Sequence, residues 1–251
     1  INLMKTIIVA AGYATRLYPL TENFPKPLLK IGDNTILGRL LDDVDRIDGL
    51  SGHVIVTNHK FAAAFEEWRA TTHYRKPITI VDDGTLTNDT RLGAVNDLLL
   101  AIDRCGIDED IMVLAADNIL EFSLQGFVDF FKEKDSSVIM CHYEPSIERL
   151  QRTGVIAVDA DMRVIEMQEK PQVPVSHWAV PPFYIYRKED LPLIRDSINC
   201  GCGCDAPGNL AHYLVDKTTV HAWQMPGRRV DIGSLDSLQE ARERYEVQKK
   251  G

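Results

Sequence analysis

The chain has 251 residues, of which 45% are hydrophobic and 26% charged, a composition typical of globular proteins. This length suits one large α/β domain, or two small domains at most. The formal net charge is −9 and Lys and Arg do not gather into a stripe, which disfavours nucleic-acid binding. Because no apolar run approaches about 18 residues and no secretory signal pattern is present, the sequence predicts a cytoplasmic protein without a membrane segment.

The five cysteines are not expected to form a disulfide framework, because their number is odd and no export signal accompanies them. Three of them, Cys200, Cys202 and Cys204, are separated by single residues. A structural zinc site usually draws on two separated pairs of ligands, and no second pair at suitable spacing follows. A glycine-spaced loop is therefore the favoured interpretation, with a metal site as the alternative.

In the first 150 residues, short apolar runs alternate with amphipathic stretches, which indicates a parallel sheet covered by helices. Buried strands are predicted at residues 6–9, 53–57, 77–81, 111–115 and 137–142. Helices are predicted between them at residues 36–47, 60–70, 92–105 and 123–134. Folds of this kind bind their ligands beyond the carboxyl ends of the strands.

After about residue 150 the pattern changes. Residues 155–158 and 164–167 flank a short polar turn and predict a hairpin. Further strands are predicted at residues 178–186 and 219–224, and helices at residues 189–198, 206–215 and 235–248. Since no linker rich in Pro, Gly or Ser separates the two halves, one domain is expected over residues 1–251.

The first predicted strand runs into a loop of small residues, Ala10-Ala11-Gly12-Tyr13-Ala14-Thr15-Arg16. Small side chains let backbone N–H groups come close to a phosphate. The loop lacks the Gly-Lys-Ser/Thr ending of a P-loop and the further glycines of the dinucleotide fingerprint. By itself it indicates either a phosphate site or a turn that only allows tight packing.

Two cations follow this loop. Arg16 has a planar fork suited to phosphate oxygens. Lys26 lies between Pro25 and Pro27, which fix an extended path and are expected to hold it near the end of the first strand. The alternative for Lys26 is an exposed loop lysine.

Residues 10–17 and Pro25-Lys26-Pro27 resemble the signature loop of the sugar-1-phosphate nucleotidyltransferases. That family usually has Gly-x-Gly-Thr-Arg, whereas this chain has alanine, Ala14, at the second glycine. The resemblance implies an α/β fold, Rossmann-like and glycosyltransferase-A-like, with a mostly parallel central sheet. It also implies that Arg16 and Lys26 are catalytic and that the triphosphate is bound by Ala10, Ala11, Gly12, Tyr13, Ala14 and Thr15.

Two aspartates are candidates for a metal site. Asp117 follows the predicted strand 111–115, and Asp231 opens the segment Asp231-Ile232-Gly233. Mg²⁺ takes one or two carboxylates together with phosphate oxygens, although either residue alone fits a helix cap or a turn equally well. Both segments resemble metal-binding motifs of the family, so the resemblance implies Mg²⁺ held between Asp117 and Asp231.

The acceptor side is implied by the resemblance of three segments, Gly154-Val155, Glu169-Lys170-Pro171 and Ala179-Val180. In the family, Lys170 would bind the acceptor phosphate and Glu169 the sugar hydroxyls, while Gly154 and Val180 would shape the pocket. Residues 1–150 would then form the nucleotide-binding half, and residues 151–251 the acceptor half with the second metal ligand. Pro181-Pro182 departs from the family pattern, so the acceptor's identity stays open.

The base pocket is expected near Asn88 and Gly93. Gly93-Ala94 resembles the segment that opens a helix under the base, and Asn88 stands where related thymidylyl- and uridylyltransferases use Gln. An amide there offers both a donor and an acceptor to a base edge. The Asp82-Asp83-Gly84 turn is interpreted as the end of a strand. Asp205-Ala206-Pro207 resembles a motif beside the acceptor pocket of some members, or simply a helix start.

The sequence thus predicts an enzyme that converts a nucleoside triphosphate and a sugar 1-phosphate to an NDP-sugar and pyrophosphate. The acceptor oxygen would attack the α-phosphorus in line, with charge neutralised by Mg²⁺, Arg16, Lys26 and Lys170. Three alternatives remain: transfer to a non-sugar phosphate such as phosphocholine, a non-catalytic regulatory subunit that binds nucleotide sugars, and a glycosyltransferase of the same fold. The base, the acceptor and the oligomeric state are not readable from the sequence.

Overall fold

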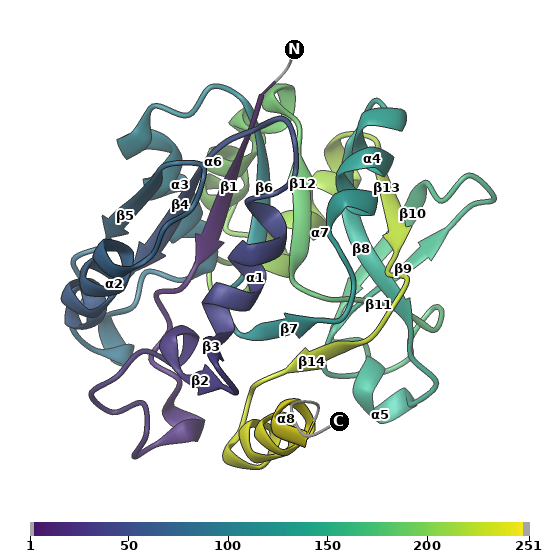
Figure 1. The fold of residues 1–251 in the computed structure, drawn as a ribbon. Helices are drawn as coiled ribbons and strands as arrows, with labels where there is room; N and C mark the ends of the chain where they lie inside the picture. Colours follow the sequence, from purple (N-terminus) through teal and green to yellow (C-terminus); the bar gives the residue numbers. More distant parts are fainter. Residues whose placement is uncertain (1–2, 248–251) are drawn as a thin grey trace.

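The structure is a computed structural model that describes residues 3–247, built around a ten-stranded mixed sheet with helices on both faces (Figure 1). None of the helices in this range combines the length and the apolar composition that crossing a membrane requires. The strand order is β10-β9-β11-β8-β12-β6-β1-β4-β5, and β13 pairs with β8 beside this path.

Four parallel strands of the first half form one side of the sheet. They are β1 (Met4–Val9), β4 (Leu50–Thr57), β5 (Ile78–Asp82) and β6 (Asp110–Ala115). Because successive side chains of a strand point to opposite faces, Ile7 joins the apolar cluster on one face and Ile8 the cluster on the other. β1, β4 and β6 are largely buried on both faces, which is why they read as apolar runs in the sequence, whereas the edge strand β5 is only partly buried.

Each face of the sheet carries its own set of helices. The cluster containing Ile8 includes side chains of α1 (Ile36–Val44), α2 (His59–Thr71) and α4 (Gln125–Glu133). The cluster containing Ile7 includes side chains of α3 (Ala94–Cys105), α6 (Pro192–Asn199) and α7 (Pro207–Lys217). The expected α/β fold is confirmed, with two apolar layers enclosing the sheet.

The second half extends the same sheet with mainly antiparallel pairs. Its strands are β9 (Gly154–Val158), β10 (Val164–Glu169), β11 (Trp178–Val180), β12 (Phe183–Tyr186) and β13 (Val220–Gln224). The last strand of the first half, β8 (Ser137–Tyr143), pairs with β11, β12 and β13. The hairpin β9–β10 is found where it was predicted. The single strand predicted at 178–186 is wrong: Pro181-Pro182 separates β11 from β12, because proline cannot donate a ladder hydrogen bond. As a result β12 lies between β6 and β8, and strands of both halves share one sheet.

Several short elements were not predicted. They are α5 (Ile147–Leu150) and the strands β2 (Lys30–Ile31), β3 (Asn34–Thr35), β7 (Asn118–Leu120) and β14 (Arg229–Asp231). Elements of two to four residues have too few positions to show a period. One of these pairs, β7 with β14, positions the candidate metal ligands.

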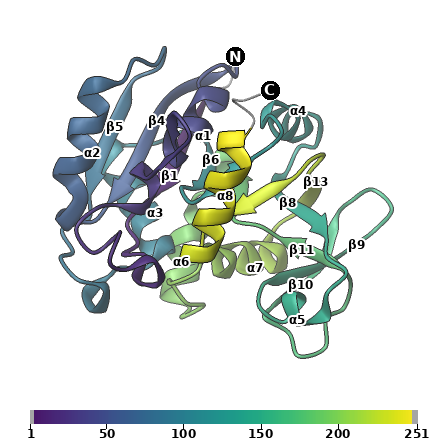
Figure 2. The same ribbon diagram turned by 60° about the horizontal axis from the view of Figure 1, so that its bottom comes forward.

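The last helix, α8 (Leu235–Val247), packs beside the first loop of the chain. It was predicted at 235–248, and Gln248 lies outside the described residues. Leu238 and Ala241 of α8 share an apolar cluster with Leu17 and Ile232. Figure 2 shows α8 crossing in front of the sheet, between the loop that follows β1 and the C-terminal strands. The end of the chain therefore supports the loop that follows β1.

The cysteine-containing loop between α6 and α7 covers the start of α3. The backbone carbonyl of Cys204 accepts a hydrogen bond from Val95 N at 2.9 Å, and that of Asp205 accepts one from Ala94 N at 3.3 Å. Free N–H groups at a helix start need such acceptors. Gly93 precedes them with φ of 88°, and a Cβ built there would lie 2.5 Å from Cys204 O.

We predict that Gly93→Ala lowers the free energy of unfolding by about 3 kcal/mol or more, because it adds a clash with the Cys204 backbone to a positive φ. Gly106 at the other end of α3 is the matched control: its φ is 59° and no atom lies within 4 Å of the Cβ position. Gly106→Ala should cost only about 1 kcal/mol. Urea denaturation of both variants checks this, and equal losses would show that the loop does not press on Gly93.

Candidate active site

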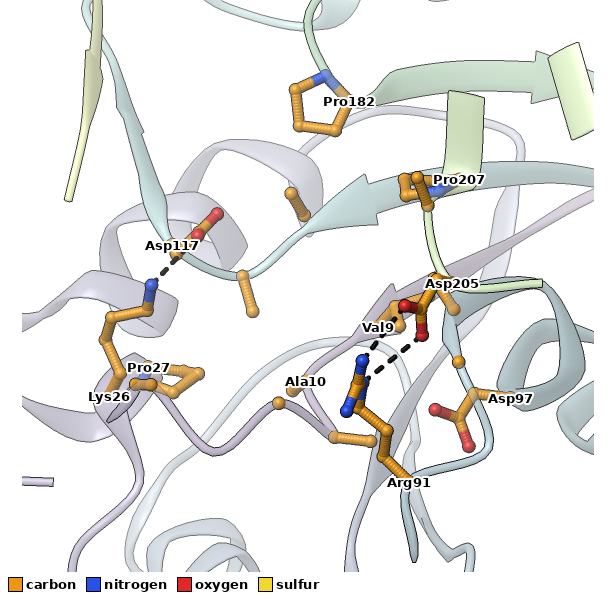
Figure 3. Close-up of a pocket in the computed structure, with 18 of the residues that line it drawn as sticks. Val9, Ala10, Lys26, Pro27, Arg91, Asp97, Asp117, Pro182, Asp205 and Pro207 are labelled. Atoms are coloured by element: carbon orange, nitrogen blue, oxygen red, sulfur yellow. Dashed lines mark hydrogen bonds and ion pairs between the residues drawn. The ribbon is translucent and has the colours of Figure 1, made fainter. Parts of the chain in front are cut away.

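A cavity of about 570 Å³ opens beyond the carboxyl ends of β1 and β6 (Figure 3). This is where ligands bind in folds with parallel strands. Nine residues predicted for the site line it: Ala10, Ala11, Gly12, Ala14, Lys26, Asn88, Gly93, Asp117 and Lys170. Residues 100 and more apart in sequence thus meet around one space.

The loop after β1 turns sharply over the cavity. Asn58 Nδ2 donates to Ala11 O at 3.0 Å from the end of β4, which fixes the loop to the neighbouring strand. Tyr13 does not line the cavity: its side chain is buried against Phe61, and its hydroxyl lies 3.3 Å from Thr85 Oγ1. Ala14 takes a left-handed conformation with φ of 49°, at the position where glycine is usual in the family that the loop resembles. The alanine therefore keeps the turn that glycine would make, at a small conformational cost.

Lys26 joins three segments at one end of the cavity. Its Nζ donates to Asp117 Oδ2 at 3.0 Å and to the backbone carbonyl of Ile232 at 3.0 Å. The flanking Pro25 and Pro27 are buried, so the position of the backbone is fixed. Lys26 is therefore held inside the cavity wall and is not an exposed loop lysine.

Asp231 is brought beside Asp117 by the short antiparallel pair β7–β14. In this pair Asp231 is opposite Asn118, and Ile232 N donates to Asp117 O at 2.9 Å. Restricted hydration raises the pKa of Asp231, and the negative charge of Asp117 raises it further. Arg229, which stands two residues before Asp231, donates through Nη1 to Asn118 Oδ1 at 2.5 Å and helps to hold the pair together.

Two neighbouring carboxylates fit a hard divalent cation. Their mutual repulsion, visible in the raised pKa of Asp231, is what a cation would relieve. Mg²⁺ takes few protein ligands and completes its shell with water and phosphate oxygens. Among residues 3–247 there is no group of three or more His, Cys, Asp or Glu side chains that could hold a metal ion. The donor set therefore suits an ion that is shared with a phosphate ligand.

The four residues predicted for the acceptor are gathered by the register of β9. Gly154 is opposite Glu169 on β10 and opposite Val180 on β11. Glu169 Oε2 lies 3.5 Å from the position that a Cβ on Gly154 would take, so a larger residue there would crowd the carboxylate. Burial raises the pKa of Glu169. Lys170 follows with φ of 48° and lines the cavity.

Some predicted residues lie outside the cavity lining. They are Tyr13, Thr15, Arg16, Gly154, Glu169, Val180 and Asp231. Arg16 is exposed on the 3₁₀ turn Thr15–Leu17, where its charge lowers the pKa of Asp231, although the effects that raise this pKa are larger.

The structure adds an ion pair that the sequence did not indicate. Arg91 Nε and Nη2 donate to the two carboxylate oxygens of Asp205 at 3.2 and 3.0 Å, and both residues line the cavity (Figure 3). Asp205 belongs to the motif before α7, so the interpretation that this motif flanks a pocket agrees with its position. Two exposed side chains 114 residues apart give no signal in sequence.

The structure also adds Asp97, a buried acid on α3 that lines the cavity. Burial raises its pKa to about 9, and a hydrogen bond with Asp83 and the charge of Asp83 add to the effect. The sequence does contain a signal that could identify Asp97. Asp97 lies one turn after Ala94 and about one turn before Ala101, on the buried side of an amphipathic helix, where an acid is out of place.

A sheet with helices on both faces and a cavity beyond its parallel strand ends defines the class: a doubly wound α/β protein. The family model described as "Nucleotidyl transferase" matches residues 5–248. The chain therefore belongs to the nucleotidyl transferase family, and it is an enzyme of the nucleotidyltransferase class.

Similar proteins agree with this assignment. The UTP–glucose-1-phosphate uridylyltransferase AglF of Haloferax volcanii is 26% identical over 253 residues, covering 97% of each chain. The glucose-1-phosphate adenylyltransferase of Clostridium novyi is 27% identical over 252 residues, but this chain spans only 65% of its length. A crystal structure of UDP-glucose pyrophosphorylase with UDP-glucose has a TM-score of 0.82 at 20% identity, covering 99% of this chain and 100% of the other. That likeness confirms the fold.

We predict that the stability of the protein falls with rising pH through Asp97. Its pKa is about 9 in the folded state against 3.8 for an ordinary aspartate, so between these values the folded protein holds a proton that the unfolded chain does not. Wild-type stability should therefore decrease as pH rises, by at most about 1.4 kcal/mol per pH unit, relative to Asp97→Asn. Tyr13, which also faces the pair, has a pKa raised above 10.0 and does not titrate in this window.

Urea denaturation of both proteins between pH 5 and pH 8 measures this difference. Asp103→Asn is the matched control, because Asp103 lies on the same helix but bonds to the exposed Arg195. A difference between wild type and Asp97→Asn that does not change with pH would mean that Asp97 is ionised in the folded protein.

Proposed function

We propose that this enzyme transfers the nucleotidyl group of a nucleoside triphosphate to a sugar 1-phosphate, releasing pyrophosphate and forming an NDP-sugar. The observation that carries the proposal is the meeting of Lys26, Asp117 and Ile232 beneath the loop that follows β1. A cation, the Asp117 carboxylate and a turn of small residues line one cavity, and Asp231 precedes the Ile232 carbonyl that Lys26 also contacts. The family assignment gives the reaction class, and these residues give it a site.

The triphosphate would lie along the loop Ala10–Thr15. The cavity is lined there by residues with a methyl side chain or none, so phosphate oxygens can approach the backbone closely. They are Ala10, Ala11, Gly12 and Ala14. Lys26 would bind the same phosphates from the opposite wall, and Arg16 would reach them from the exposed turn. The base would extend toward Asn88 and Gly93 at the start of α3.

Asp117 and Asp231 would hold Mg²⁺. When bound, the ion would supply charge neutralisation for the triphosphate. The chain itself contributes the two carboxylates, and it holds one of them, Asp117, through Lys26 Nζ at 3.0 Å. Asp117 Oδ1 also accepts from Asn118 Nδ2 at 2.7 Å, so its orientation is set on both oxygens.

The acceptor would occupy the side of the cavity formed by the second half of the chain. Lys170 would bind its phosphate, while Glu169, beside Gly154 and Val180, would accept hydrogen bonds from sugar hydroxyls. A sugar 1-phosphate is already ionised and needs no general base. Its oxygen would attack the α-phosphorus in line, and the residues would act by positioning and by stabilising charge.

Uridine triphosphate and glucose 1-phosphate are the first pair to test, since a relative that matches 97% of this chain is named for them. Nucleotide sugars would be the product class, consistent with the predicted cytoplasmic location of the enzyme. Transfer to phosphocholine is the second candidate, and the acceptor screen distinguishes the two.

We expect pyrophosphate release when the purified protein is given Mg²⁺, one of the five common triphosphates and a sugar 1-phosphate. The screen crosses the triphosphates with a panel of sugar 1-phosphates and with phosphocholine. Release that requires both substrates supports the proposal. Release with phosphocholine and no sugar phosphate would assign the other acceptor class, and no release with any pair would contradict nucleotidyl transfer.

Two sets of variants test the site. Lys26→Met should lower kcat/KM by about 100-fold or more, because it removes a cation at the reacting phosphate. Lys30→Met is the control and should not lower it, because Lys30 is exposed.

Asp231→Asn should lower turnover by about 100-fold or more, because it removes a proposed metal ligand. Asp236→Asn, on the exposed start of α8, is its control and should leave turnover unchanged. Near wild-type turnover of Asp231→Asn at saturating Mg²⁺ would contradict the metal assignment.

A further inference from the structure

The buried Asp97 and the half-buried Asp83 form a pair of carboxyl groups that the proposed reaction does not use. Asp83 Oδ1 accepts two hydrogen bonds from Thr85, from its N at 2.8 Å and from its Oγ1 at 2.7 Å. Among the described residues, no N–H or O–H donor reaches Asp83 Oδ2 or Asp97 Oδ1, and both oxygens are buried. Buried oxygens without donors are costly, so this pair needs an explanation.

One proton held between the two carboxyl groups satisfies both oxygens. Two carboxyl groups with adjacent buried oxygens cannot both be ionised, and the raised pKa of Asp97 places the proton there at neutral pH. Asp83 already accepts two hydrogen bonds on its other oxygen, so it acts as the acceptor of the pair. In this arrangement Asp97 Oδ1 donates to Asp83 Oδ2, and Asp97 Oδ2 remains as an uncharged carbonyl-type acceptor.

Asp97 lies far along the cavity from the phosphate end. Figure 3 shows it to the right of Arg91, on the opposite side of the view from Lys26 and Asp117. Val9, Ala94 and Val113 give the cavity an apolar lining, while Arg91 and Asp205 satisfy each other in an ion pair. The side chain of Asp97 itself is only 3% exposed, yet it lines the cavity. A planar apolar group with a polar edge, which describes a nucleobase, matches these surroundings.

We propose that Asp97 is a specificity-determining residue, which accepts a hydrogen bond from an N–H on the edge of the nucleobase through Oδ2 while Asp83 holds its other oxygen. The inference rests on the proposed function, because it assumes that the base enters this end of the cavity. A neutral acceptor suits this position, since a base edge carries no charge to offset a carboxylate. Discrimination arises because a base without an N–H at this point leaves Oδ2 buried and unpaired.

The test measures the binding of each of the five common triphosphates, with Mg²⁺, by titration calorimetry. It compares the wild type with Asp97→Asn, Asp97→Leu and the control Asp103→Asn. Asparagine keeps a carbonyl acceptor in the same place, whereas leucine has a similar shape and no acceptor. Thermal melting of each variant shows whether it folds.

The wild type should prefer one base. In Asp97→Leu the affinity for that triphosphate should fall about 10-fold or more, with little change for the others, so that the preference is lost. Asp97→Asn and Asp103→Asn should keep the preference. An equal fall for all five triphosphates would indicate a structural role and overturn the inference, as would an unchanged preference in Asp97→Leu or equal wild-type binding of all bases. Wild-type binding of no triphosphate would instead contradict the proposed function.

Discussion

The contact of Lys26 with Asp117 and with the carbonyl of Ile232 is the interaction on which the site depends. It joins the segment after β1, the end of β6 and the end of β14, which are 91 and 206 residues from Lys26 in sequence. The ammonium group offsets the charge of the Asp117 carboxylate, which lies beside Asp231. Without this cation, two adjacent carboxylates would remain at the end of one short strand pair, and their repulsion would oppose the pairing of β7 with β14.

The net charge of the chain is −9, but the lining of the cavity contains cations as well as acids. Two of its cations form ion pairs with acids, Lys26 with Asp117 and Arg91 with Asp205. At the other end, burial and the neighbouring Asp83 keep Asp97 protonated at neutral pH. The two ends of the cavity therefore differ: Lys26 and Asp117 lie at one, and the protonated Asp97 lies with the Arg91–Asp205 ion pair at the other.

Much of the fold could be predicted, because buried parallel strands such as β1 and β6 are apolar runs and α3 has a clear helical period. The loop motif and Asp117 could be predicted for the same reason, since both directly follow such strands. The approach of Asp231 to Asp117 could not be derived from local pattern, because β14 has three residues and its partner lies more than 100 residues earlier. It was expected only from the family resemblance. The pair Arg91–Asp205 gives no periodic signal, whereas Asp97 does, as an acid on the apolar side of a helical pattern.

The central claim is that the phosphate of the acceptor attacks the α-phosphorus of the triphosphate. The most direct measurement follows a radiolabel placed in the α-phosphate of one triphosphate sample and in the γ-phosphate of another, each incubated with sugar 1-phosphate and Mg²⁺. The account predicts that the α label appears in the nucleotide sugar and the γ label in pyrophosphate. Transfer of the γ label to the sugar phosphate, or its release as inorganic phosphate, would contradict it.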